Sequence, residues 1–233
     1  MQFRFSTVVC VLFSFVCALA NASQLTDDEA KAGWRLLFDG ASTKGWRALG
    51  KKEFPEKGWE VVDGCLHHIA KAGGGDITFD EAFENFEFTF EWKVAPGANS
   101  GVKYRVTDKP GSAYGPEYQV IDDDKHADAK NGKRSSGALY DLFVPAKEKV
   151  LKPVGEFNLS KIVVNGNHLE HWLNGVKLVD VEVGTDIWKS AIAASKFAKT
   201  PDFGSQAKGQ ICIQDHGDEV WYRNLKIRPT PAK

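Results

Sequence analysis

Hydrophobic and polar residues alternate one by one in several short stretches of the chain, which is the pattern of strands with one buried face. In residues 86–92, four aromatic side chains share one face and three polar side chains share the other. In residues 168–173, Leu169, His171 and Leu173 share one face. No stretch has the 3.6-residue period of a long helix. The pattern therefore predicts a protein built mainly of strands.

Glycine, asparagine, aspartate and proline separate these runs. Asn165-Gly166, Asn174-Gly175 and Asp63-Gly64 stand between apolar runs and favour tight type I′ hairpins. A short helix is expected at 26–32, where Thr26 and Glu29 have the spacing of a capping box. The predicted strands are 34–38, 59–62, 65–69, 86–94, 101–106, 117–121, 137–142, 158–164, 168–173, 176–183, 209–214 and 220–227.

Many short strands without interleaved helices indicate two antiparallel sheets packed face to face. No repeat of 20–50 residues and no linker divides the chain after residue 22. We therefore expect an all-β, two-sheet antiparallel sandwich that forms a single domain over residues 23–233.

The first 22 residues have the pattern of an export signal. A stretch without charge runs from Val8 to Ala20, and Arg4 is the charged residue before it. The stretch is too short for an anchored membrane helix, and Ala18, Ala20 and Ala22 offer A-x-A cleavage sites. We predict a signal peptide at 1–22, no transmembrane segment, and a protein exported to the periplasm or the extracellular medium.

The charge balance and the cysteines narrow the class of protein further. The chain has 30 basic and 31 acidic residues, so it lacks the positive field that holds nucleic acid or an anionic membrane. A content of 42% hydrophobic and 12% aromatic residues is too high for a disordered chain. Beyond the predicted signal, Cys65 and Cys212 remain. In an exported protein they can form a disulfide, and two buried free thiols are the equal alternative.

The densest polar segment spans residues 115–128. On its predicted strand, Glu117 and Gln119 point to the same face, where a carboxylate beside an amide suits sugar hydroxyls or a metal. The acidic turn that follows makes Glu117, Asp122 and His126 candidate ligands of a divalent cation such as Ca²⁺, Mn²⁺ or Zn²⁺. The spacing is not that of an EF-hand, and a solvated acidic turn is the simpler alternative.

A second polar segment, 214–218, closes a predicted strand beside a tight turn. His216 within it suits proton transfer near neutral pH, and loops at strand ends commonly carry functional residues. A structural histidine is the alternative interpretation. Trp46, Trp188 and Tyr114 lie in turn-like segments, where they either stack on sugar rings or belong to the core.

Several common catalytic motifs do not occur in the sequence. It contains no G-x-S-x-G, no phosphate-binding G-x-x-x-x-G-K-[ST], no H-E-x-x-H and no E-x-D-x-x-E carboxylate pair. The corresponding hydrolase, nucleotide-binding, zinc-protease and glucanase mechanisms therefore have no support.

Short motifs follow one another in order from about residue 33 to 229. They are LLFDG (36–40), GW (45–46), WEVVDG (59–64), NSGV (99–102), GPEYQ (115–119), GALY (137–140), HWLNG (171–175), QDHG (214–217) and VWYRN (220–224). Their number and order, more than any one of them, resemble the 3-keto-disaccharide hydrolase family.

This resemblance implies a concanavalin A-like jelly-roll sandwich, export, and action on glycosides already oxidised at C3 of a sugar ring. A ketone at C3 acidifies the C2 hydrogen, and the glycosidic oxygen leaves from C1, so a base can expel the aglycone by elimination. Addition of water then gives net hydrolysis. The implied base is His216 or His126, and the implied acid is Glu117 or Tyr140. A divalent cation, Arg105 or Lys196 is expected to stabilise the enolate. The residues expected to bind the substrate are Gln119, Gln214, Asn99, Arg105 and Lys196.

Two other classes of function remain as alternatives. A non-catalytic carbohydrate-binding sandwich module would use its aromatic residues to hold intact glycan without cleaving it. A structural envelope protein is less attractive, because it gives no role to the polar segment. A sugar is the expected partner both of a 3-keto-glycoside hydrolase and of a carbohydrate-binding module.

Overall fold

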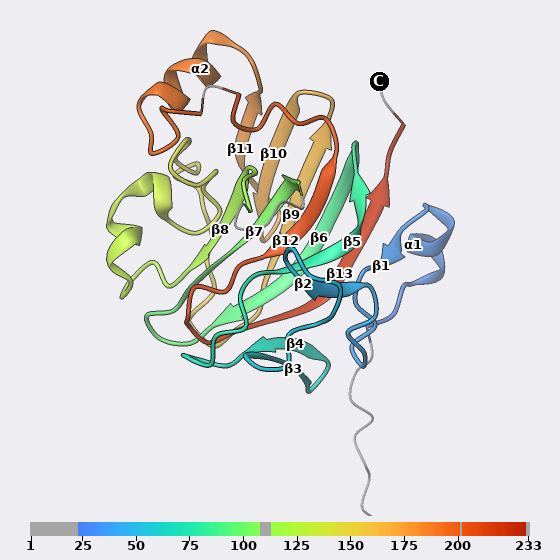
Figure 1. The fold of residues 1–233 in the computed structure, drawn as a ribbon. Helices are drawn as coiled ribbons and strands as arrows, with labels where there is room; N and C mark the ends of the chain where they lie inside the picture. The colour runs from blue at the N-terminus through green and yellow to red at the C-terminus, as the bar shows by residue number, and fades with distance from the viewer. Residues whose placement is uncertain (1–22, 108–112, 201, 232–233) are drawn as a thin grey trace, which may run out of the picture.

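The computed structural model describes residues 23–107, 113–200 and 202–231, so the predicted signal peptide at 1–22 lies outside the described residues. Over these residues the chain consists mostly of strands (Figure 1). The strands are β1 (Arg35–Leu36), β2 (Trp46–Ala48), β3 (Trp59–Val62), β4 (Cys65–His68), β5 (Ile77–Phe83), β6 (Phe86–Val94), β7 (Asn99–Val106), β8 (Glu117–Ile121), β9 (Asn158–Asn165), β10 (His168–Leu173), β11 (Val176–Glu182), β12 (Gly209–Ile213) and β13 (Val220–Pro229). The helices are α1 (Asp27–Lys31), the 3₁₀-helices η1 (Ala127–Lys130) and η2 (Gly132–Arg134), and α2 (Asp186–Ala193).

The strands of the described chain form two antiparallel sheets. One has eight strands in the order β11-β10-β9-β6-β13-β4-β3, with β1 paired to β13. The other has five strands in the order β2-β5-β12-β7-β8. Figure 1 shows α2 beyond β10 and β11 and α1 beside β1, with neither helix inserted between the sheets. The predicted all-β, two-sheet sandwich is confirmed. Within the described chain, no helix is long and apolar enough to span a bilayer.

The aromatic face of β6 fills the space between the sheets. Residues of β6 are fully and partly buried in strict alternation, as the sequence predicts. The Phe90 ring meets Tyr118 of the five-stranded sheet edge-on, with ring centres 5.4 Å apart, and Phe86 meets Tyr104 at 6.5 Å. Removal of these large side chains from water is the main force that holds the two sheets together.

Tyrosine hydroxyls inside this core are paired across the sheets. A buried hydroxyl without a partner costs free energy, so each of these bonds also fixes how one sheet sits on the other. The pairs are Tyr104 Oη with His171 Nε2 (2.9 Å), Tyr222 Oη with Ser100 Oγ (2.8 Å) and Tyr118 Oη with Ser160 Oγ (2.8 Å).

The predicted helix start and two of the predicted turns are confirmed. Thr26 accepts a hydrogen bond from the Glu29 N–H, and the Glu29 carboxylate accepts one from the Thr26 N–H, which is the expected capping box of α1. At Asn174-Gly175 and at the 63–64 turn, both central residues have positive φ, as a type I′ turn requires.

Two local predictions are wrong. Residues 137–142 form no strand, because Gly137 and Asp141 have positive φ and turn the chain. The β9–β10 hairpin exists, but Asn165 pairs with His168 and the loop consists of residues 166–167. Gly166 takes the positive φ, and its backbone N–H donates to a side chain outside the hairpin, so tertiary contacts override the Asn-Gly preference.

The strands β2 and β5 and the helix α2 were not predicted. In α2, Trp188 and Ile192 are one turn apart and face the protein, and the Thr185 side chain caps the first turn. A helix of eight residues shows too few turns for its period to stand out from the sequence.

Cys65 on β4 and Cys212 on β12 are free thiols in different sheets, so the disulfide alternative is wrong. Both side chains are buried, and burial raises the pKa of each thiol. They act as small apolar residues of the sandwich.

The buried His171 predicts a loss of stability in acid. Its Nδ1 lies 3.2 Å from Gly137 O and its Nε2 faces the Tyr104 hydroxyl, so a neutral ring with a proton on Nδ1 satisfies both partners. Burial lowers the pKa of His171 from 6.5 to about 4. As the pH falls through this range, the unfolded chain takes up the proton first. Between about pH 6.5 and pH 4, the shifted pKa of His171 should therefore lower the free energy of unfolding by about 3 kcal/mol.

Urea unfolding of His171→Asn between pH 6.5 and pH 4 measures this contribution. Asparagine can still donate to Gly137 O but does not titrate, so its stability should fall less steeply with acid than that of the wild type. Equal slopes for the two proteins would contradict the assignment.

Candidate active site

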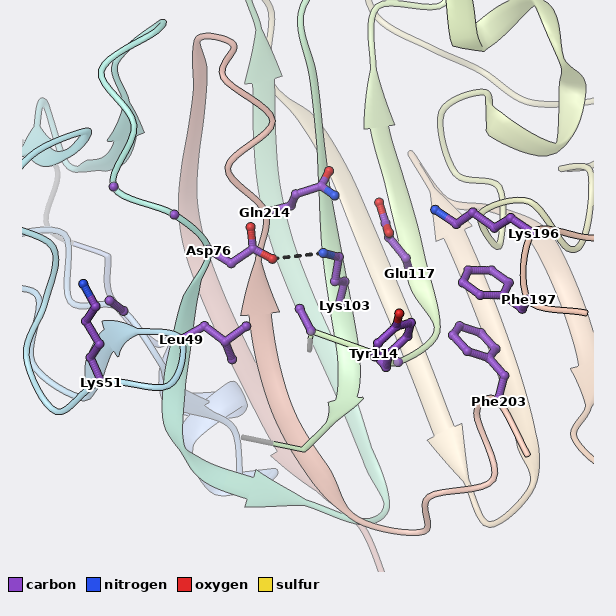
Figure 2. Close-up of a pocket in the computed structure, with 15 residues that line it drawn as sticks. Leu49, Lys51, Asp76, Lys103, Tyr114, Glu117, Lys196, Phe197, Phe203 and Gln214 are labelled. Atoms are coloured by element: carbon purple, nitrogen blue, oxygen red, sulfur yellow. Dashed lines mark hydrogen bonds and ion pairs between the residues drawn. The ribbon is translucent and has the colours of Figure 1, made fainter. Parts of the chain in front are cut away.

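A pocket of about 750 Å³ opens on the outer face of the five-stranded sheet (Figure 2). Its size is typical of sites that enclose a small molecule. The residues that line it come from the middle of β7, from the ends of β2, β8 and β12, and from the loops after β2 and before β5, β8 and β12. They are Ala48, Leu49, Lys51, Gly74, Gly75, Asp76, Lys103, Ala113, Tyr114, Gly115, Glu117, Lys196, Phe197, Phe203 and Gln214.

The alternation of β7 and β8 selects the side chains that reach the pocket. Lys103 pairs directly with Glu117 in the strand register, and both line the pocket. Their neighbours Tyr104 and Tyr118 point the other way, into the core. The Glu117 side chain lies over Gly101, where an added Cβ would be 2.3 Å from Glu117 Oε1. Glycine at 101 therefore makes the room that this carboxyl group needs.

Lys103 is a fixed positive charge in the pocket. Its Nζ donates to Asp76 Oδ2 at 2.9 Å, and Asp76 Oδ1 accepts the backbone N–H of Asp215 at 3.0 Å. Burial by itself lowers the pKa of Lys103, but the carboxylates of Glu117 and Asp76 outweigh burial and raise the pKa overall. The ammonium form is therefore kept at neutral pH, and Asp76 is occupied in holding it.

Glu117 and Lys196 form the part of the pocket that can exchange protons. Figure 2 shows the Lys196 amine extending toward the Glu117 carboxyl group. Burial raises the pKa of Glu117, and the charges of Lys103 and Lys196 only partly oppose this. Burial lowers the pKa of Lys196, and Glu117 only partly opposes that. Opposite shifts move both groups toward neutrality, which suits general acid–base chemistry.

Lys196 is positioned by the loop that follows α2. Its backbone N–H donates to Asp141 Oδ2 at 2.8 Å, and Asp141 in turn accepts from Arg134 Nε at 2.7 Å. The Lys196 Nζ lies 4.1 Å from the centre of the Tyr140 ring. Tyr140 therefore stands beside the pocket without lining it, and burial raises the pKa of its hydroxyl.

A polar strip, defined here as Glu117, Gln119, Asn99 and His216, extends from the pocket along the same face of β7 and β8. Gln119 Nε2 donates to Asn99 Oδ1 at 3.0 Å, and Asn99 Nδ2 lies 3.4 Å from His216 Nε2. Gln119 and Asn99 are almost fully buried, whereas His216 is exposed. The structure thus brings these predicted residues to one face, with only Glu117 in the pocket itself.

Gln214 is the other predicted residue that lines the pocket. Its backbone N–H donates to Gly101 O at 2.9 Å, and its carbonyl accepts from Ser100 Oγ at 2.8 Å. Ser100 Oγ also accepts the Tyr222 hydroxyl. A tyrosine of the core therefore helps to fix this wall of the pocket.

The three candidate metal ligands are not brought together. Asp122 is buried, and its carboxylate accepts backbone N–H groups of its own turn and of Gly97 in the loop between β6 and β7. Glu117 belongs to the pocket. His126 stands beside His216 instead, with ring centres 5.7 Å apart. The carboxylate of Asp122 thus shapes a turn, and it belongs to no ligand cluster of the described residues.

Arg105 does not reach the pocket. Its side chain is buried, and its guanidinium donates to Gly166 O and Gly204 O. It therefore ties the β9–β10 loop to the loop before β12. Trp46 and Trp188 are buried core residues, so neither can offer a sugar-binding platform.

Tyr114 does line the pocket and is 59% exposed. Phe197 and Phe203 lie near it in Figure 2 and stack on each other with ring centres 3.8 Å apart. One side of the pocket is therefore aromatic, and the other carries the charged groups.

Sequence reasoning missed Asp76, Lys103, Phe197 and Phe203. Of these four residues, only Lys103 could have been found from the sequence. Antiparallel pairing of the predicted strands 101–106 and 117–121 would have placed Lys103 opposite Glu117. Asp76 follows a glycine-rich loop, and the two phenylalanines lie in a segment without periodicity.

The fold and the pocket together define a β-sandwich with a pocket on one sheet that holds two titratable groups with shifted pKa values. The sandwich is similar to that of a Bacillus subtilis protein with a galectin-like fold, at 13% identity and a TM-score of 0.50 over 82% of this chain and 92% of that one. Residues 33–228 match the 3-keto-alpha-glucoside-1,2-lyase-like domain, and the chain belongs to this family of enzymes.

Two relatives agree with this assignment and confirm the resemblance read from the motifs. A 3-keto-disaccharide hydrolase of Bacteroides thetaiotaomicron is 39% identical over 228 residues, which cover 84% of this chain and 78% of that protein. A crystal structure of a candidate glycosyl hydrolase from Parabacteroides distasonis is 32% identical with a TM-score of 0.81, over 90% of this chain and all of that chain.

The environment of Glu117 predicts that removing its charge stabilises the protein. A raised carboxyl pKa means that, as the pH rises above 4.5, the unfolded chain releases this proton before the folded chain does. The free energy of unfolding therefore falls from pH 4.5 up to the raised pKa. Glu117→Gln should abolish that fall and melt at a higher temperature than the wild type at pH 7.

Thermal melts of both proteins from pH 4.5 to pH 8 test this expectation. Glu87→Gln is the matched control, since Glu87 lies on the outer face of β6 and pairs with Arg228. A Glu117→Gln protein that melts below the wild type at pH 7 would contradict the prediction.

Proposed function

We propose that this enzyme cleaves 3-keto-glycosides, including 3-keto-disaccharides, by removing the C2 proton, eliminating the aglycone and adding water. The observation that carries the proposal is that Glu117 and Lys196 line the same pocket of about 750 Å³, beside the fixed charge of Lys103 and with the Lys196 amine extending toward Glu117. The activity named for the Bacteroides thetaiotaomicron relative supports the class of substrate.

The arrangement of charges fits elimination better than ordinary glycoside hydrolysis. Hydrolysis through an oxocarbenium ion uses two carboxyl groups that flank the bond. Here Asp76 is engaged by Lys103 and by a backbone N–H, which leaves Glu117 as the available carboxyl group in the pocket lining. A 3-keto substrate needs no oxocarbenium ion, because its C2 proton is already acidified by the ketone.

Each charged group has a role that follows from its surroundings. One member of the Glu117–Lys196 pair accepts the C2 proton, and the other donates a proton to the departing oxygen. Lys103 keeps its charge and stabilises the negative oxygen that develops on C3. Gln214 contacts the sugar from the pocket wall, and the aromatic side at Tyr114 packs against the leaving group.

The alternative of a non-catalytic carbohydrate-binding module has less support. Two of its three platform aromatics, Trp46 and Trp188, lie in the core. A binding platform also gives no reason for the burial of the Glu117 carboxyl group, which raises the pKa of that group.

We also infer that the enzyme is exported and meets its substrate outside the cytoplasm. The uncharged stretch from Val8 to Ala20 and the small residues that end it carry this inference. Detection of a mature chain that begins near Ser23 in the periplasm or medium would test it.

Replacement of the proton-transferring carboxyl group should abolish most of the activity. Glu117→Gln is expected to lower kcat on 4-nitrophenyl 3-keto-glucoside by about 10²- to 10⁴-fold, which is the usual contribution of a general acid or base. Release of nitrophenol measures the rate. Glu87→Gln, on the outer face of the other sheet, should keep wild-type activity.

The same assay distinguishes the reaction types. The unoxidised glucoside should react far more slowly than the 3-keto compound, and deuterium at C2 should slow the reaction because that bond breaks. The proposed function would be refuted if the glucosides with and without the ketone react at equal rates, or if the protein binds both glucosides and cleaves neither.

A further inference from the structure

Two histidines and a carboxylate meet at the far end of the polar strip. One possible ligand atom from each of His126, His216 and Asp218 lies within 4.8 Å of the others. The two imidazole rings stand at 77° to each other. His126 and Asp218 are half-buried and His216 is exposed, so the group is firmly placed and still open to solvent.

The charge of Asp218 is not matched by a lysine or arginine among the described residues. Its Oδ2 accepts the Asn99 N–H at 3.0 Å and lies 3.5 Å from His216 Nδ1. His126 caps η1 through its Nδ1, which accepts the Asp128 N–H at 3.2 Å. This distance is at the long end of the usual range for hydrogen bonds. If His126 used Nδ1 to bind a metal, the loss of this weak hydrogen bond would therefore cost little free energy.

A second group of three possible ligands, with one histidine and two carboxylates, shows the contrast. His168, Glu170 and Asp180 on β10 and β11 also have possible ligand atoms within 4.8 Å of one another. There, Lys177 Nζ lies 2.9 Å from Glu170 Oε1 and 2.6 Å from Asp180 Oδ2. An ammonium group thus already bridges the carboxylates of that group, and none bridges to Asp218 within the described chain.

The amides of the polar strip can hold His216 as a ligand. As placed, Gln119 Oε1 is buried without a hydrogen-bond partner, and after the amide is turned Nε2 takes that position, so this atom favours neither arrangement. Turning the Gln119 and Asn99 amides end for end moves no heavy atom appreciably. Asn99 Oδ1 then accepts a hydrogen bond from the His216 Nε2–H, and Asn99 Nδ2 donates to Gln119 Oε1. His216 Nδ1 is left with a lone pair on the side of Asp218, and a ligating histidine usually donates its other N–H to an oxygen in this way.

We propose that His126, His216 and Asp218 bind one divalent transition-metal ion at the end of the polar strip. Two imidazoles and one carboxylate suit Zn²⁺, Co²⁺ or Mn²⁺, whereas Ca²⁺ prefers a shell of oxygens. Three protein ligands leave further coordination positions open to solvent or to an oxygen of a sugar. The two histidines are then ligands and not bases, which agrees with proton transfer by Glu117 and Lys196.

Binding of Co²⁺ to the purified chain tests this site without any substrate. Equilibrium dialysis should find one Co²⁺ at this site per chain, and the visible absorption of the ion should indicate nitrogen ligands. His216→Ala and His126→Ala should each weaken binding at least about 10-fold, since even the loss of a supporting residue has an effect of this size. The matched control, His168→Ala, should bind as the wild type does, and excess Ca²⁺ should not displace the ion.

Failure to bind Co²⁺, unchanged binding in both His216→Ala and His126→Ala, or loss of binding in His168→Ala would each overturn the proposal. Thermal melts of the variants show whether they fold. In the wild type, broadening of the His126 and His216 ring signals by paramagnetic Co²⁺ gives a test that needs no variant. The result is independent of the proposed cleavage activity, because Glu117, Lys103 and Lys196 do not belong to this site.

Discussion

The structure depends on tyrosines of β7 and β8 that lie between the sheets and bind partners on the opposite sheet. Tyr104 and Tyr118 can meet His171 and Ser160 only if they point inward. Since side chains alternate along a strand, the same constraint points Lys103 and Glu117 outward, opposite each other. A slip of one residue would bury two charges and expose two aromatic rings, so the packing of the core sets the composition of the pocket.

The pocket combines one charge that is fixed with two groups whose charge can change. Asp76 holds Lys103 in its ammonium form, whereas burial moves Glu117 and Lys196 toward their neutral forms. A reaction that moves a proton next to a ketone needs such a division, because the developing enolate requires a lasting positive charge and the proton requires a group that changes its state. The proposed elimination therefore does not require the pair of free carboxyl groups that most glycosidases use.

The sequence was sufficient for the fold class because alternation over runs such as 86–92 has a single physical explanation, a sheet with one buried face. The resemblance to the family also selected Glu117, Gln119 and His216, which the structure places on one polar face together with Asn99. The roles of these residues were not readable, because burial and charge partners decide them. Arg105 illustrates this, since its guanidinium is used by two loop carbonyls. Asp76, far from Lys103 in the chain, could be found only once β5, β12 and β7 were placed side by side.

The chain of hydrogen bonds from Tyr222 through Ser100 to the Gln214 carbonyl crosses from one sheet to the pocket wall. Phenylalanine would fill the space of Tyr222 almost equally well, and evolutionary drift normally allows such an exchange inside a protein. Here the exchange would release the serine hydroxyl that supports Gln214. Selection on the shape of the pocket should therefore restrict Tyr222, a core position far from the pocket opening, to tyrosine.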